Sequence, residues 1–147
     1  MTSVTVRRIV LGALAVGGPL LMAAPAHAEG FGQLAAVPVV ASPTCGGTVS
    51  GEAQLTPVQV GDRVDSGVRV AINYDAGIYD GSCRLTVTAG WTNLTTGASG
   101  TGDITAVSTI DGHYGFIGYA NTTFETGPGA VVITLSSHPG EEINLSV

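Results

Sequence analysis

The feature that most constrains the fold is a strict alternation of apolar and polar side chains along short segments. The clearest segment has apolar side chains at every second position: Cys83, Leu85, Val87, Ala89 and Trp91. Residues 68–74 and 131–136 repeat the pattern. Successive side chains of a β-strand point to opposite faces of a sheet, so each segment is expected to be a strand with one buried face.

Turn-forming residues separate these segments. Asp111-Gly112 stands where a two-residue hairpin turn needs positive φ, and Gly127-Pro128-Gly129 interrupts the chain further on. Weaker strand patterns cover residues 104–110 and 114–121, and candidate edge strands cover residues 48–55 and 143–147. Strands at this spacing predict an all-β fold, an immunoglobulin-like antiparallel β-sandwich of about seven strands.

The N-terminal residues have the pattern of a bacterial secretory signal peptide. Arg7 and Arg8 precede a long apolar run, and Ala26-His27-Ala28 places small side chains before a cut at Glu29. We therefore expect a cleavable signal peptide at residues 1–28, an extended N-terminal arm or linker at 29–44 and the β-sandwich domain at 45–147. The product is expected to be secreted, to the cell envelope or outside a bacterial cell, with no stable membrane anchor after cleavage. The general export route and the twin-arginine route both remain open.

The chain has two cysteines, Cys45 and Cys83, and we expect them to form a disulfide. An even number of cysteines in an oxidising compartment favours pairing. A redox-active pair would need C-x-x-C spacing, and a zinc site would need more Cys and His ligands than the chain offers. The bond would join the N-terminal edge of the fold to its middle.

The charge of the chain excludes one class of partner. After residue 28 there are three arginines, no lysine and eleven carboxylates. Such a protein has no basic surface with which to neutralise phosphates, so neither nucleic acid nor an anionic membrane is an expected partner.

No catalytic pattern stands out. His113 and His138 lie in turn sequences and are expected to be solvated, and no G-x-S-x-G motif accompanies them. Asp65-Ser66-Gly67 matches part of a serine-protease string without its flanking glycines. Asp75 and Asp80 are the best candidates for a Ca²⁺ site, but the chain has no D-x-D-x-D-G ladder. We therefore expect no resident metal and no cofactor.

The aromatic side chains form the remaining candidate site. Tyr114, Phe116 and Tyr119 fall in one expected strand with apolar residues at both parities. One interpretation is a central strand or a homodimer interface. The other is an aromatic patch or cleft that includes Trp91 and binds a ligand or partner.

In size, acidic composition and expected strands, the chain resembles the secreted apoproteins that carry enediyne antibiotics. Those proteins usually have two disulfides, whereas this chain can form one. The resemblance implies a sandwich fold. The function we expect is that of a small exported non-enzymatic protein that binds a protein or another component of the envelope or medium. The alternatives are a carrier of a small apolar ligand in an aromatic cleft and a small secreted hydrolase.

Overall fold

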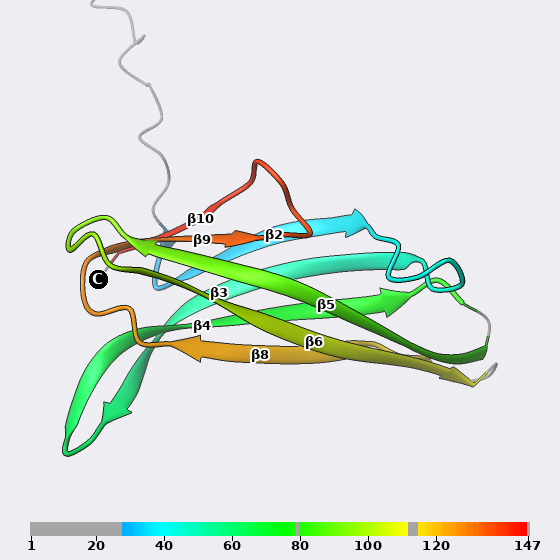
Figure 1. The fold of residues 1–147 in the computed structure, drawn as a ribbon, viewed down its shortest axis with the longest axis horizontal. Helices are drawn as coiled ribbons and strands as arrows, with labels where there is room; N and C mark the ends of the chain where they lie inside the picture. The colour runs from blue at the N-terminus through cyan, green and yellow to red at the C-terminus, as the bar shows by residue number, and fades with distance from the viewer. Residues whose placement is uncertain (1–27, 79, 112–114, 147) are drawn as a thin grey trace, which may run out of the picture.

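Two β-sheets packed face to face make up the part of the chain that the computed structural model describes, which is residues 28–78, 80–111 and 115–146 (Figure 1). The expected signal peptide falls almost entirely outside this part, as do Tyr79, His113 and Tyr114. None of the described residues belongs to a helix that is long and apolar enough to cross a membrane.

The described chain contains ten strands, more than the expected seven. They are β1 (Ala28–Glu29), β2 (Phe31–Pro38), β3 (Gly47–Val60), β4 (Arg63–Ala76), β5 (Asp80–Asn93), β6 (Ser99–Asp111), β7 (Gly115–Phe116), β8 (Gly118–Phe124), β9 (Ala130–Leu135) and β10 (Ile143–Ser146). The six-stranded sheet has the order β1-β10-β9-β5-β6-β7, and the four-stranded sheet has the order β2-β3-β4-β8. All pairs are antiparallel except β1 with β10.

The alternating segments form the strands that their pattern predicts. In β5 the inward side chains of Cys83, Leu85, Val87 and Ala89 are at most 8 % exposed, while Arg84 and Thr86 between them are exposed. β4 and β9 follow the same rule. The expectation of an all-β sandwich with two packed sheets is thus confirmed.

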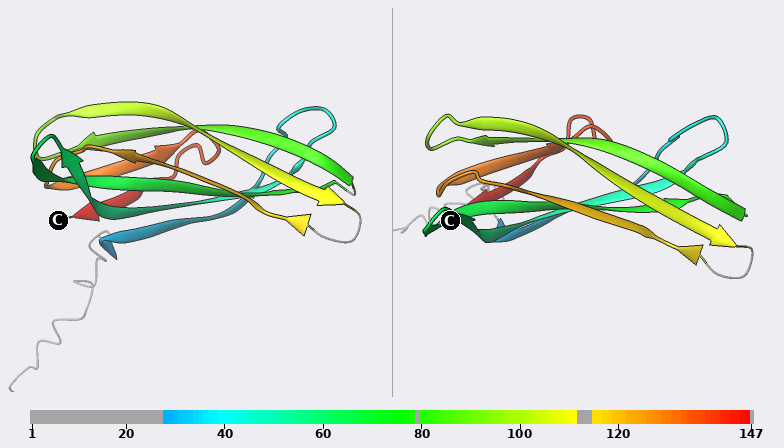
Figure 2. Two further views of the ribbon diagram at one scale, coloured as in Figure 1. Left: turned by 90° about the horizontal axis from the view of Figure 1, so that it is seen from below. Right: turned by 60° about the horizontal axis from the view of Figure 1, so that its bottom comes forward.

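The core lies between the two layers, which Figure 2 shows one above the other in its left view. The four-stranded sheet contributes Ile72 and Tyr74, and the six-stranded sheet contributes Val87, Ile104 and Ile133. All five side chains are buried. This burial is the main stabilising contribution in such a fold.

Several segments differ from what the sequence predicted. Residues 48–55 were expected at an edge, but β3 pairs with both β2 and β4 and is an interior strand. The expected strand 114–121 is divided between the sheets: β7 pairs with β6, whereas β8 pairs with β4. Residues 29–44, expected as an arm or linker, contain β2, whose Leu34 is 7 % exposed and belongs to the core.

Close contacts join the two sheets along both of their long sides. On one side, Gly118 of β8 lies directly against the backbone of Val107 and Ser108 in β6. On the other, His138, in the connection from β9 to β10, bonds through Nε2 to the carbonyl oxygen of Ala35 in β2 at 2.8 Å. The two sheets are therefore held together by more than their apolar core.

The end of the β3–β4 hairpin extends beyond the sandwich, at the lower left of Figure 1. β3 pairs with β2 only as far as Gln54, and β4 begins to pair with β8 at Val68. We call residues 56–65 the ribbon, because there the two strands pair only with each other. Its turn includes Gly61 in the left-handed region, with φ of 58°.

Candidate functional site

The disulfide expected from the sequence is present. Cys45 lies in the connection from β2 to β3, Cys83 lies near the start of β5, and their Cα atoms are 5.7 Å apart. The bond joins the two sheets at one end of the sandwich, as a structural link.

The four aromatic residues expected to share a patch do not come together. Trp91 is near the end of β5 and packs against Phe124 of β8, with ring centroids 6.4 Å apart. Phe116 pairs with Thr109, which pairs with Ser82 near the beginning of β5. Nine residues of extended strand separate Ser82 from Trp91, a distance of about 30 Å. Tyr114 lies outside the described residues.

Phe116 and Tyr119 are both exposed, at 64 % and 50 %, but they lie on different sheets. Phe116 is on the outer face of the six-stranded sheet, and Tyr119 is opposite Asn73 on the outer face of the four-stranded sheet. Apolar side chains occur at both parities here because the chain changes sheets at Ile117. Another tyrosine, Tyr74, is buried in the core and donates a hydrogen bond to the carbonyl oxygen of Gly46 at 2.9 Å.

His138 corrects an expectation. It is 1 % exposed rather than solvated. Nε2 must donate to the carbonyl of Ala35, because a carbonyl only accepts; in a neutral ring, Nδ1 then accepts from the Ser137 hydroxyl at 2.8 Å. A serine that donates to an imidazole is also the first element of a nucleophilic site. Here, however, a backbone carbonyl occupies the position where such a site has a carboxylate.

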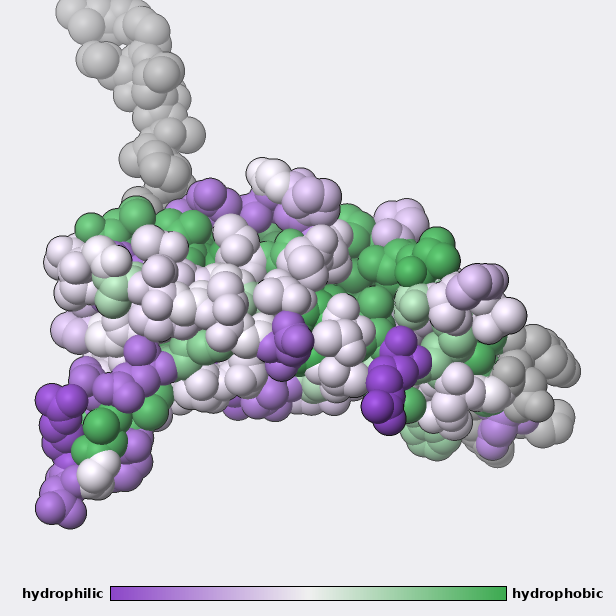
Figure 3. Space-filling model, viewed as in Figure 1, coloured by the Kyte–Doolittle hydropathy of each residue, from purple (hydrophilic) through white to green (hydrophobic). Residues whose placement is uncertain are grey.

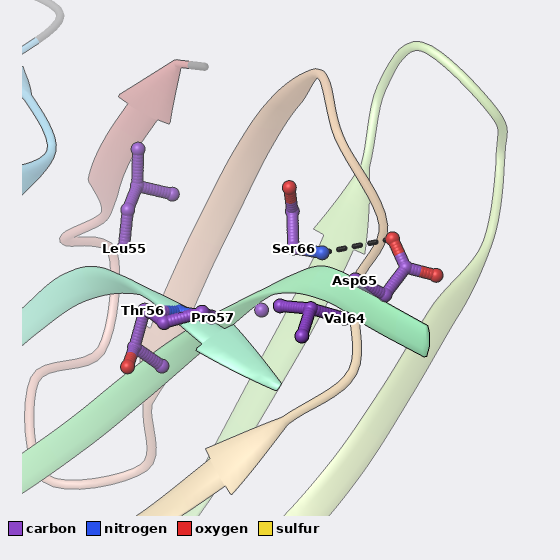
Figure 4. A pocket seen from close by; sticks show the side chains of 7 residues that line it. Leu55, Thr56, Pro57, Val64, Asp65 and Ser66 are labelled. Atoms are coloured by element: carbon purple, nitrogen blue, oxygen red, sulfur yellow. Dashed lines mark hydrogen bonds between the residues drawn. The ribbon is translucent and has the colours of Figure 1, made fainter. Parts of the chain in front are cut away.

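The remaining sequence candidates are Asp75, Asp80 and the Asp65-Ser66-Gly67 string. Asp75 is exposed near the end of β4, and Asp80 is the first residue of β5. No group of three His, Cys, Asp or Glu side chains able to hold a metal occurs among the described residues. In the Asp65-Ser66-Gly67 string, the Asp65 carboxylate accepts a hydrogen bond from the backbone N–H of Ser66 at 2.8 Å (Figure 4). This is a local contact between neighbouring residues of β4.

Several open hollows lie on the surface of the described residues. One of about 370 Å³ lies at the base of the ribbon, between Pro57 and Val64 (Figure 4). A second, about 630 Å³, lies beside Trp91 and Leu94 on the six-stranded sheet. A third, about 450 Å³, lies over β2, β3 and β4 on the other sheet, where Gln33, Glu52 and Asn73 line it.

The outer face of the six-stranded sheet is rich in Ser and Thr that bond one another. Cross-strand hydrogen bonds join Ser82 to Thr109 at 3.0 Å and Thr86 to Thr105 at 2.8 Å. Thr88 donates to the carboxylate of Asp103 at 2.8 Å. In Figure 3, which views this face, most residues have the pale colours of weakly polar side chains. Much of the hydrogen-bonding capacity of this face is thus already used within the sheet.

The outer face of the four-stranded sheet is different in composition. Directly opposed residues of antiparallel strands lie on the same face, so the register sorts the outward side chains into three rows across the sheet. We call these three rows the polar face: Phe31-Gln54-Arg69-Thr123, Gln33-Glu52-Ala71-Asn121 and Ser50-Asn73-Tyr119. Four of its side chains are amides.

The amide and charged side chains of the polar face have no hydrogen-bond or ion-pair partner among the described residues. Within the described residues, no side-chain hydrogen bond or ion pair involves Gln33, Glu52, Gln54, Arg69, Asn73 or Asn121. Ala71, at the centre of the middle row, is 1 % exposed because longer side chains surround it. The face therefore has a small side chain at its centre and available donors and acceptors around it. Its pattern was not recognised in the sequence, because each strand contributes only two or three of these side chains.

Comparisons of the chain with protein-family models, with curated proteins and with solved structures found no match.

Proposed function

We propose that the protein is an exported, non-enzymatic binding protein and that the polar face is its binding surface. The observation that carries the proposal is the contrast between the two outer faces. Hydroxyl groups of the six-stranded sheet pair with one another, whereas the amides, Glu52 and Arg69 of the polar face have no partner among the described residues. Such groups supply orientation and specificity when a ligand binds.

We also propose that the sandwich is immunoglobulin-like, and the strand order supports this. Without the short strands and β2, one sheet reads β3-β4-β8 and the other reads β6-β5-β9-β10. This is the order of a seven-stranded immunoglobulin-like sandwich in which the fourth strand has moved to the second sheet. In that description β2 is an additional N-terminal strand beside the first one.

The proposal also includes a location for the protein and the exclusion of one class of partner, and both are argued from the sequence. The N-terminal signal pattern and the disulfide favour an extracellular or envelope location. The excess of carboxylates disfavours nucleic acid as a partner.

The test is photo-crosslinking of tagged protein to the envelope and medium of the producing cell. We would compare the wild type with the double variant Asn73→Arg/Asn121→Arg, which places two long cationic side chains on the polar face. The matched control is Thr86→Arg/Thr101→Arg, on the outer face of the other sheet. We expect the crosslinked species to disappear in the first variant and to persist in the second. Equal crosslinking by both variants would contradict the proposal, and a product of two copies of the chain would identify a homodimer instead.

A carrier of a small apolar ligand is a second candidate, because a hollow of about 630 Å³ lies beside Trp91. Mass spectrometry of protein extracted from its native source would reveal a bound compound. A Trp91→Ala variant that loses such a compound would favour the carrier over the binding protein.

A small hydrolase is the third candidate, because Ser137 and His138 are hydrogen bonded. A fluorophosphonate probe that labels the wild type and not Ser137→Ala would support it. Absence of labelling and of turnover on ester, peptide and glycoside substrates would count against it.

A further inference from the structure

We propose that the polar face binds an extended chain of neutral sugar residues. This inference rests on the proposed function, because it names the ligand class of the same surface.

The charge of the face indicates a neutral ligand. The three rows contain one cation, Arg69, and one anion, Glu52. The whole chain, by contrast, has eleven carboxylates and five arginines. The balance of charge within the rows means that the face itself has no net attraction to an anionic or a cationic polymer.

The chemistry of the free side chains matches sugar hydroxyl groups. Each amide, as in Asn73 and Asn121, offers both a donor and an acceptor, and a sugar hydroxyl also donates and accepts. Arg69 and Glu52 add charge-assisted hydrogen bonds, which are stronger than neutral ones. A flat apolar protein surface would find few partners among these groups, so the face suits a hydroxyl-rich ligand better than an apolar one.

Two exposed aromatic rings lie at diagonally opposite corners of the face. Phe31 is 41 % exposed on β2, and Tyr119 is 50 % exposed on β8. The two residues are three strands and two rows apart, so their Cα atoms are separated by about 20 Å. An aromatic ring offers an apolar face on which the C–H side of a pyranose can pack. The separation suits a short oligosaccharide and exceeds the size of one sugar.

The centre of the face favours a ligand that lies along the surface. Ala71 is the shortest side chain of the middle row, and the hollow of about 450 Å³ lies over the β2 side of the same row. Residues of three neighbouring strands, Gln33, Glu52 and Asn73, line this hollow, so it crosses strands of the sheet. Together with the two aromatic corners, this shape fits an extended glycan.

The test is isothermal titration calorimetry of the full processed protein. The probes are neutral hexasaccharides of different linkage, namely cellohexaose, maltohexaose and mannohexaose, with hexagalacturonate and chitosan hexamer as acidic and basic comparators. We expect at least one neutral hexasaccharide to bind with a Kd below about 1 mM. A few hydrogen bonds and one or two stacked rings together supply an affinity of this order. The charged comparators are expected to bind at least about tenfold more weakly.

Variants assign the binding to the face. Asn121→Ala and Tyr119→Ala change exposed side chains and are each expected to weaken binding about tenfold. Thr101→Ala, on the outer face of the other sheet, is the matched control and should bind like the wild type. Shifts of backbone amide NMR signals in β3, β4 and β8 of the wild type would locate the same surface without any substitution.

The inference would be wrong if no neutral hexasaccharide binds at about 10 mM ligand, which is on the order of the weakest measurable affinity. It would also be wrong if the face variants bind the hexasaccharide as well as Thr101→Ala does. A charged comparator that binds as tightly as the best neutral hexasaccharide would contradict it too. If sugars fail to bind but crosslinking is still lost in Asn73→Arg/Asn121→Arg, the binding function stands and only the ligand class is wrong. If both tests fail, the proposed function is wrong as well.

Discussion

Several polar side chains are buried in this sandwich, and each is held by hydrogen bonds to its surroundings. Asn93 donates to the carbonyl oxygens of Thr126 and Pro128 and accepts from two backbone N–H groups of the turn that follows β5. Within the described residues, no buried side-chain nitrogen or oxygen lacks a partner. Because an unpaired buried polar group is costly, removing one partner should destabilise the fold more than the bond itself contributes.

Tyr74 provides a prediction at this scale. Burial raises the pKa of its phenol, so the folded state holds the proton more tightly than the unfolded chain. The resulting stability is present below the unfolded pKa of about 10 and is lost as the pH rises above it. Tyr74→Phe should lower the free energy of unfolding by about 1 kcal/mol at pH 8, through the lost bond to Gly46.

Urea unfolding at about pH 8 and pH 11 checks both parts of this prediction. Between these values the wild type should lose more stability than Tyr74→Phe, which has no phenol to ionise. An identical loss in the two proteins would show that Tyr74 does not contribute to the alkaline transition.

Individual residues also show what the sequence could not reveal. His138 was expected to be solvated because it precedes Pro139 in a turn sequence, yet a long-range contact with Ala35 buries it. The rows of the polar face could not be predicted from the sequence for the same reason. They are assembled from four strands whose register is decided by tertiary pairing, which no local pattern reports.

The elements themselves were predicted best where the apolar pattern was strict. The segments around β4, β5 and β9 alternate cleanly and form the expected strands. β2 was missed because its run of Gly, Ala and Val has no clear period. The division of residues 114–121 between the two sheets was missed. Alternation of apolar and polar side chains indicates that a segment is extended, but it does not indicate to which sheet the segment belongs.

The contact between β6 and β8 gives a prediction for these elements. A Cβ atom on Gly118 would lie 2.6 Å from the carbonyl carbon and oxygen of Val107, which are backbone atoms. Gly118→Ala should therefore separate the two strands and cost about 1–3 kcal/mol of unfolding free energy. Gly115→Ala is the control, because its nearest neighbour would be the Ile110 side chain at 3.8 Å. Equal melting temperatures for the two variants would contradict the proposed contact.

The disulfide gives a second prediction for the elements. The Cys45–Cys83 bond closes a loop with a sequence separation of 38 residues, for which the chain-entropy estimate is about 4 kcal/mol. Reduction with dithiothreitol should lower the melting temperature by at least about 10 °C. The double variant Cys45→Ala/Cys83→Ala should melt at a similarly low temperature and be insensitive to the reductant. A melting point that dithiothreitol leaves unchanged would show that the bond adds no stability.

The whole molecule depends on its apolar core rather than on ion pairs. The described residues contain one ion pair, Arg63–Asp65 at 3.7 Å, with the arginine side chain 70 % exposed. The excess of carboxylates, by contrast, acts over the whole surface. Added salt screens this repulsion and removes little attraction, so stability should rise with ionic strength.

Thermal unfolding in about 10 mM and about 200 mM NaCl tests this expectation. We expect the melting temperature to increase by a few degrees in the higher salt. A decrease would mean that attractive pairs, rather than repulsion, dominate the electrostatics of the folded state. Arg63→Ala provides the control and should respond to salt like the wild type, since an exposed pair contributes little.

The position of the disulfide has a consequence for the durability of the protein when a protease attacks it. The exposed ribbon is the natural place for a protease to cut, because it makes few contacts with the sandwich. Cys45 and Cys83 lie on either side of the whole β3–β4 hairpin. A nick in the ribbon therefore leaves the two fragments covalently joined, and they separate only when the bond is reduced.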